Sequence, residues 1–141
     1  GTPNLPGIAG LFAGTTWVLE QGIKPIHSQE MKLWRKLRDG LREIPGMILY
    51  CADDVPGRER VAVLSFNLQG IEAADVGTML DVDHNIACRT GLHCAPMVHE
   101  HLGTDSIHGA VRFGIGPFNT DAHIDAAIAG VKDIASGRAK R

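Results

Sequence analysis

A cysteine and a histidine adjoin in a stretch whose residue types could carry out nucleophilic chemistry. Gly91 and Pro96 bracket Cys94, which predicts a loop where a substrate could reach the thiol. The thiolate is the nucleophile, and positive charge from Arg89 or from a protonated His93 would favour it. One interpretation is therefore a reactive thiol beside an anion-binding arginine. The other is a buried, apolar cysteine near a surface salt bridge, since most cysteines serve packing.

A second arginine lies within an apolar run. Arg112 is flanked by Val111 and Phe113, and a charge among buried residues is costly without a partner. The planar guanidinium suits a carboxylate, which it can bind through two parallel hydrogen bonds. Arg112 could thus hold the carboxylate of a substrate, or it could form an internal ion pair with an aspartate or a glutamate. The residue types favour neither interpretation.

Histidines and cysteines gather in one part of the chain and raise the question of a metal site. Their spacing lacks the short Cys-x2–4-Cys pair that is typical of structural zinc, so we expect no metal ion. Apart from His93, we expect surface or supporting histidines at His84, His99, His101 and His108. Thr2, next to Gly1 and ahead of a helix, could bind an anion through its hydroxyl and the backbone amides, although a plain turn is the default.

Apolar periodicity predicts the elements that would position these residues. Helical spacing follows the N-cap residue Asn4 as far as Gly22, and it resumes from Pro25 to residue 44, with Arg38 on the solvent face. We predict further helices at 72–80, 97–102 and 120–136 and strands at 47–51, 61–67, 86–89 and 110–115, with 61–67 central. This order predicts an α+β fold in which a small, largely antiparallel sheet has helices packed on one face.

The composition is that of a single globular domain of 141 residues, with 44% apolar residues and a net charge of −2. This charge balance gives no basic surface for nucleic acid. No apolar run approaches the ~20 residues that cross a bilayer, and no charged-then-apolar leader opens the chain. Three cysteines without close pairing, Cys51, Cys88 and Cys94, argue against a disulfide framework. We therefore expect a cytoplasmic protein that binds neither nucleic acid nor membrane.

Several stretches, taken together, resemble one family. The resemblance rests on residues 1–8, Arg89-Thr90-Gly91-Leu92-His93-Cys94-Ala95-Pro96, Val111-Arg112-Phe113 and Phe118-Asn119-Thr120. These stretches are similar to the C-terminal part of class V aminotransferases, which depend on pyridoxal phosphate. Within that family they look like the group of cysteine desulfurases and selenocysteine lyases. The resemblance implies the fold of the small C-terminal domain of such an enzyme.

The resemblance also implies roles for the residues singled out above. Cys94 would be the thiol that takes sulfur from L-cysteine, which leaves a persulfide on the protein and releases alanine. Arg112 would hold the carboxylate of the substrate, and Arg89 would line the same pocket. His93 would position the thiol or exchange a proton with it. A separate protein could then accept the sulfur.

The same resemblance implies a cofactor and a partner subunit. Thr2, with Gly1, would reach the phosphate of pyridoxal phosphate bound by the other subunit of a homodimer. The family's lysine that binds the cofactor covalently lies in a larger N-terminal domain, and none of the five lysines here has its setting. We therefore expect a fragment with a junction helix region at 1–22 and the small domain at 23–141, which alone neither binds the cofactor covalently nor turns over.

Other functions stay open. Leu92 stands where many close desulfurases have a histidine, and residues 97–103 look like a less-studied branch described simply as class V aminotransferase. Activity as an aminotransferase, or as a lyase on another amino acid, is thus an alternative. A non-catalytic module that binds a small carboxylate or a metal ion is an alternative of a different class.

Overall fold

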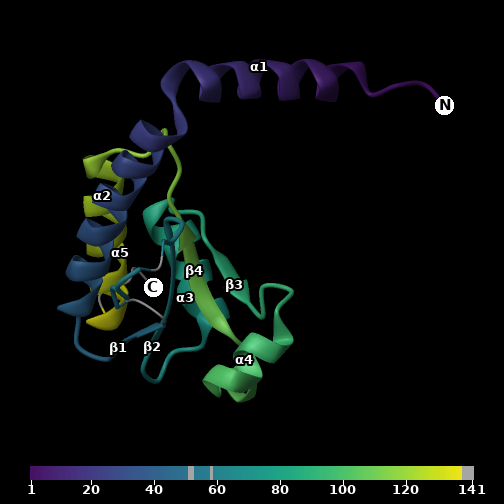
Figure 1. The fold of residues 1–141 in the computed structure, drawn as a ribbon. Helices are drawn as coiled ribbons and strands as arrows, with labels where there is room; N and C mark the ends of the chain where they lie inside the picture. Colours follow the sequence, from purple (N-terminus) through teal and green to yellow (C-terminus); the bar gives the residue numbers. More distant parts are fainter. Residues whose placement is uncertain (51–52, 58, 138–141) are drawn as a thin grey trace.

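The computed structural model describes residues 1–50, 53–57 and 59–137, which form five α-helices and one four-stranded antiparallel sheet (Figure 1). The strands lie in the order β1-β2-β4-β3. The α+β fold predicted from the sequence is confirmed. In chain order the elements are α1 (Leu5–Gln21), α2 (Ile23–Arg42), β1 (Met47–Tyr50), β2 (Val63–Leu68), α3 (Ala73–His84), β3 (Arg89–Gly91), α4 (Pro96–Leu102), the 3₁₀ turn η1 (Asp105–Ile107), β4 (Ala110–Gly114) and α5 (Asp121–Ala135).

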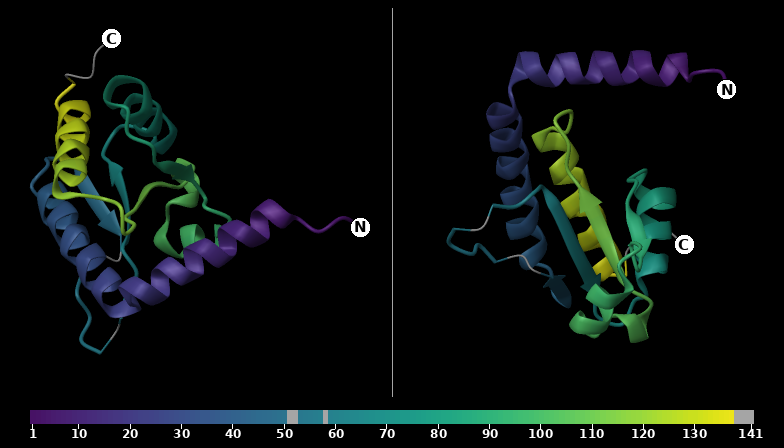
Figure 2. Two further views of the ribbon diagram at one scale, coloured as in Figure 1. Left: turned by 90° about the horizontal axis from the view of Figure 1, so that it is seen from above. Right: turned by 45° about the vertical axis from the view of Figure 1, so that its right-hand side comes forward.

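One face of the sheet is covered by helices α2, α3 and α5, and the core lies between these two layers (Figure 2). Trp34 of α2 is fully buried, and its indole N–H donates a hydrogen bond to the carbonyl of Val63 at 2.9 Å. This bond fixes α2 to the central strand β2. Alternate residues of the two inner strands point into the core, namely Leu64, Phe66, Val111 and Phe113.

The opposite face of the sheet carries polar residues in register. Tyr50, Ser65, Arg112 and Arg89 are successive Cα partners across all four strands. Side chains alternate between the faces along a strand, so Arg112 points away from the core that its neighbours Val111 and Phe113 fill. The row therefore lies on the face that α2, α3 and α5 leave open.

Helix α1 stands apart from the sheet. Asn4 accepts a hydrogen bond from the amide of Gly7 at 3.1 Å, so the predicted N-cap is confirmed. At the other end Gly22, with φ 81°, allows the sharp turn into α2, and α1 projects from the domain with the N-terminus at its far end (Figure 1). None of its residues is buried. No helix in the described part of the chain, α1 included, has the length and apolarity needed to span a membrane.

Two of the strands begin later than predicted, and the ends of β2, β3 and β4 differ from the prediction by one or two residues. The strand predicted at 86–89 begins only at Arg89, because the amide of Ile86 donates to the carbonyl of Leu80 at 2.9 Å and closes α3 instead. The central strand begins at Val63, two residues later than predicted. Cys51, the last residue of the first predicted strand, lies outside the described residues.

The prediction that Arg38 lies on the solvent face of its helix is wrong. Arg38 is only 9% exposed, with its guanidinium 5.1 Å from the centre of the Trp34 ring. Its Nε donates to Asp39 at 2.7 Å and its Nη1 donates to Asp54 at 2.8 Å. These two carboxylates compensate the cation that the helix buries, and the second one joins the 53–57 segment to α2.

Candidate active site

Two arginines face each other across β3 and β4. Arg89 and Arg112 are Cα partners, and the Cβ atoms of such a pair lie about 4.5–5.5 Å apart. Arg112 is half-buried and Arg89 is exposed. Within the described residues, neither guanidinium has a carboxylate within 4.0 Å. The internal ion pair considered for Arg112 is therefore not formed there, and both cations can receive an anion from outside.

The loop that carries Cys94 begins where the β3 and β4 backbones come very close. Gly91 pairs with Ala110, and a Cβ atom on Gly109 would collide with the carbonyl of Gly91. Gly109 also has φ 99°, which favours glycine. Cys94 follows on this loop and is exposed. The predicted accessible loop position is thus confirmed, and the interpretation of Cys94 as a buried packing residue is wrong.

His93 and Cys94 lie on a strained turn. Both have left-handed backbone conformations, with φ 54° and 59°, which are uncommon for residues other than glycine. The amide of Ala95 donates to the carbonyl of Leu92 at 2.9 Å and closes the turn, after which Pro96 begins α4. Such strain concentrates at functional sites, because the surrounding structure must hold it in place.

The imidazole of His93 lies in an environment that disfavours its protonated form. Its pKa lies below the ordinary value, first because the ring is desolvated, then because Arg112, His99 and Arg89 repel a positive charge. The nearby carbonyl of Ala110 favours the protonated ring, but neither buried ring nitrogen has a hydrogen bond of ordinary geometry within the described residues. His93 is therefore neutral at neutral pH and electrostatically coupled to both arginines.

The other histidines and cysteines do not form a metal centre in the described part of the chain, where no three metal-ligating side chains come together. His99 is buried, with 4% exposed, and its ring centre lies 5.7 Å from that of His93. Nothing in the sequence pattern predicts that His99 is buried. Cys88 packs against Gly77 of α3, and burial, with a smaller effect of Asp81, raises the pKa of its thiol.

The structure does not bring Thr2 and Gly1 to the Cys94 loop. Both are exposed at the free end of α1, whereas α4 and its loop lie at the opposite end of the domain (Figure 1). Helix α1 contacts the domain through α2 and through Trp17, whose ring centre lies 5.0 Å from that of Phe118. A shared site of Thr2 and Cys94 would therefore need a second chain.

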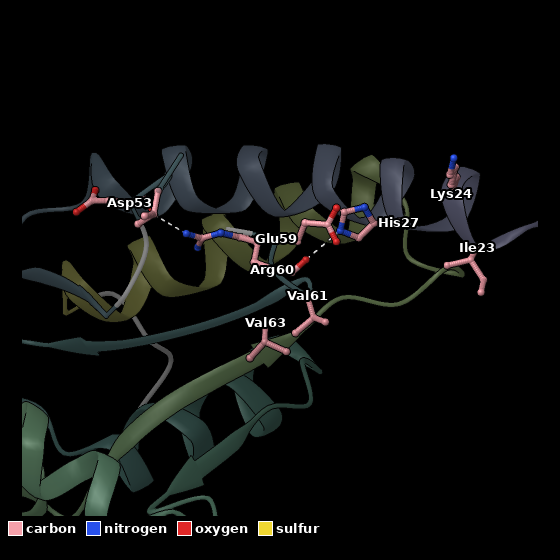
Figure 3. A pocket seen from close by; sticks show the side chains of 9 residues that line it. Ile23, Lys24, His27, Asp53, Glu59, Arg60, Val61 and Val63 are labelled. Atoms are coloured by element: carbon pink, nitrogen blue, oxygen red, sulfur yellow. Dashed lines mark hydrogen bonds between the residues drawn. The ribbon is translucent and has the colours of Figure 1, made fainter. Parts of the chain in front are cut away.

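A groove that the sequence did not predict lies between the start of α2 and the segment before β2 (Figure 3). It has a volume of about 1050 Å³, and the apolar side chains of Val61 and Val63 lie along it. His27 bonds through Nε2 to the carbonyl of Arg60 at 2.9 Å, and the Arg60 guanidinium donates to the carbonyl of Asp53. None of the predicted site residues lines this groove, so it is separate from the Cys94 region.

Comparison with known proteins gives one consistent result. The family model "Aminotransferase class-V" matches residues 1–127. A cysteine desulfurase of Klebsiella pneumoniae is 37% identical over 135 residues, which are 95% of this chain and 31% of that protein. A probable cysteine desulfurase of Synechocystis is 35% identical over 125 residues, 89% of this chain and 29% of that protein. The chain thus spans less than a third of the length of these relatives.

Solved structures agree with the sequence comparison. The apo structure of a cysteine desulfurase from Thermococcus onnurineus superposes with a TM-score of 0.84 at 33% identity, covering 97% of this chain and 32% of that one. The cysteine desulfurase CsdA of Escherichia coli, in an S-sulfonic acid form, superposes with a TM-score of 0.80 at 28% identity, covering 99% and 32%. The fold described above is therefore one that cysteine desulfurases contain.

Proposed function

Because this chain belongs to the class-V aminotransferase family, we propose that it is part of a cysteine desulfurase, in which Cys94 takes the sulfur of L-cysteine. One observation carries the proposal: an exposed thiol on a strained turn follows a strand whose Arg89 faces Arg112, with no carboxylate beside either arginine in the described residues. The thiol supplies a nucleophile. The arginine pair supplies a place for the carboxylate of an amino acid.

Arg112 is the better placed of the two arginines to bind the substrate carboxylate. It lies on the central part of the open sheet face and is half-buried, so water competes less for its hydrogen bonds. Its planar guanidinium can bind both carboxylate oxygens at once. Arg89 adds a second positive charge on the same face and is more accessible to solvent.

Cys94 reacts as a thiolate, and His93 is the adjoining group that can take its proton. In that step the S–H bond breaks, the electron pair stays on Sγ, and a nitrogen of the neutral imidazole gains the proton. The thiolate then attacks the substrate's sulfur, so that an S–S bond forms on Cys94 as the substrate's C–S bond breaks. Pyridoxal phosphate, which this family uses in general, supplies the electron sink when bound.

The residues of this chain fit the phosphate of that cofactor but not its covalent attachment. Thr2 and Gly1 lie exposed ahead of the N-terminus of α1, where the helix dipole favours an anion. Pro6 has no amide hydrogen, and the amides of Leu5 and Gly7 already donate to Pro3 and Asn4, so the Thr2 hydroxyl and the amides that precede Leu5 are the donors left for an anion. We propose that they serve the other subunit of a homodimer.

The lysines within the described residues lie away from Cys94. Lys32 and Lys36 pair with Asp121 between α2 and α5, and Lys24 and Lys132 lie in helices. Lys140 lies outside the described residues. We propose that the covalent lysine belongs to another part of the protein, with residues 1–22 as a junction and 23–141 as a small domain. We place this enzyme in the cytoplasm, with a separate protein to accept the sulfur.

A different class-V reaction, such as transamination, is the alternative that the family itself favours. Transamination needs the carboxylate site but no thiol, so Cys94 distinguishes the two reactions. The test compares the full-length protein with its Cys94→Ala variant and with Cys88→Ala as the matched control. We expect L-cysteine to give alanine and sulfide with wild type and Cys88→Ala, and neither product with Cys94→Ala. Equal activity of all three proteins would refute the role of Cys94.

A further inference from the structure

A buried histidine lies directly behind the reactive turn. His99 of α4 is 4% exposed, and its Nδ1 lies 2.7 Å from Oγ1 of Thr104, which is itself only 2% exposed. A buried imidazole is costly unless it is hydrogen-bonded, and this contact meets that requirement. It also fixes the plane of the ring, because the hydroxyl holds one of its two nitrogens.

Thr104 is itself held from two sides. Its amide donates to the carbonyl of His99 at 2.9 Å, and its carbonyl accepts from the amide of Gly109 at 2.8 Å. The first bond closes the C-terminal end of α4, and the second joins that end to the start of β4. Thr104 therefore links the ring of His99 to the start of β4, so the position of the ring depends on the position of the β3–β4 strand pair.

The fixed ring of His99 contacts the imidazole of His93 without a hydrogen bond between them. The two ring centres are 5.7 Å apart and the planes are inclined by 48°. Neither nitrogen of His93 has a hydrogen bond of ordinary geometry in the described part of the chain, so the ring is held by packing, with the ring of His99 on one side and the carbonyl of Ala110 nearby. Arg89 from β3 and Arg112 from β4 are the other charged groups that act on it.

We propose that His99, held by Thr104, is a positioning residue for the reaction at Cys94: its ring keeps the imidazole of His93 neutral and in one place on the turn that carries the thiol. The proposal rests on the proposed desulfurase function, and it adds residues that contact neither the substrate nor the thiol. Without His99, the His93 ring gains water and loses a neighbour that repels positive charge. Both changes raise the pKa of His93, so that, as the pH is lowered, its neutral imidazole becomes protonated at a higher pH than in wild type.

The test uses the full-length enzyme with substitutions at Thr104 and His99 and one control. Thr104→Val removes the hydroxyl and Thr104→Ser restores it, while His99→Asn removes the ring and His101→Asn is the control on the exposed side of α4. For Thr104→Val and His99→Asn we expect kcat to fall about tenfold or more with KM for cysteine nearly unchanged. We also expect the acid limb of the kcat/KM profile to move up by about half a pH unit or more. Thr104→Ser should recover most of kcat, and His101→Asn should match wild type.

A second readout does not depend on turnover. Alkylation of Cys94 by iodoacetamide, followed by peptide mass spectrometry, should speed up about threefold or more at neutral pH in Thr104→Val and His99→Asn, because a more protonated His93 favours the thiolate. If wild type releases no sulfide from cysteine, the proposed function fails and the alkylation rates still decide this inference. Unchanged kcat, pH profile and alkylation in both variants would overturn it. A loss that Thr104→Ser does not recover would also overturn it.

Discussion

Arg89 and Arg112 are direct partners across an antiparallel ribbon, so two like charges share one face of the sheet. Like charges at such positions destabilise a sheet. No carboxylate of the described residues relieves the repulsion. The pair is therefore better suited to binding an anion than to holding the fold together.

Binding of the substrate through its carboxylate should depend on Arg112. Replacing it with alanine in the full-length enzyme leaves that carboxylate without its charged donor, a loss of about 1.5–3 kcal/mol. We expect KM for L-cysteine to rise roughly tenfold to a hundredfold in steady-state assays of alanine release. Arg112→Lys should recover only part of the loss, because an ammonium lacks the planar fork. The exposed Arg35→Ala on α2 is the control, and a similar rise in KM there would argue against a specific site.

The free chain should become more stable when the arginine repulsion is removed. In urea denaturation, we expect Arg89→Gln and Arg112→Gln each to raise the free energy of unfolding by about 0.2–1 kcal/mol. The double variant should gain less than the sum of the two, since the repulsion is lost once. The gain should shrink at high salt, which screens exposed charges. A double-mutant cycle that shows attraction between the two positions would contradict the arrangement.

Gly109 should tolerate no side chain. A methyl group there meets the carbonyl of Gly91 and stands on a φ of 99°, so Gly109→Ala should cost about 1–3 kcal/mol of unfolding free energy. Gly114→Ala at the other end of β4 is the matched control, because its methyl group would meet no atom within 4 Å. Thermal unfolding of the two variants checks this. Equal unfolding midpoints for the two variants would show that the close approach of the Gly109 and Gly91 backbones is not essential to stability.

Stability at low pH should depend on the carboxylates around Arg38. Hydrogen bonds from Arg38 hold the pKa of Asp39 and of Asp54 below the ordinary value of 3.8. A lowered pKa in the folded state means that the stabilisation is complete above 3.8 and is lost as the pH falls through the folded pKa. We expect the variant with both aspartates replaced by asparagine to lose less stability than wild type between about pH 6 and about pH 3. Parallel losses in urea denaturation would refute this.

The sequence was informative where local periodicity decides the structure. The buried stripe of α2, with Leu33, Trp34, Leu37 and Leu41, and the central strand β2 could be predicted from spacing alone. The accessible position of Cys94 followed from the turn-forming residues around it.

What could not be predicted depends on residues that are distant in sequence. Arg38 is buried because Asp54, sixteen positions away, folds back onto it, and residue type alone suggested solvent. Arg89 and Arg112 face each other only because of the register in which their two strands pair, and neither strand's sequence determines that register alone. His99 is buried because Thr104 and the β3–β4 ribbon enclose it. The roles of Cys94, His93, Arg112, Arg89, Thr2 and Gly1 stay predictions.

The pairing of Gly91 with Ala110 marks the point where one long loop leaves the sheet and the point where it returns. Residues 92–109 leave the ribbon and return to it at paired positions, and they carry His93, Cys94, His99 and Thr104. Insertions in such a loop are cheap, because doubling its length costs only about 0.6 kcal/mol of closure entropy. Mutation and selection could therefore rebuild the segment that bears the nucleophile, or lengthen it toward a new acceptor, while the strand register kept the two arginines in place.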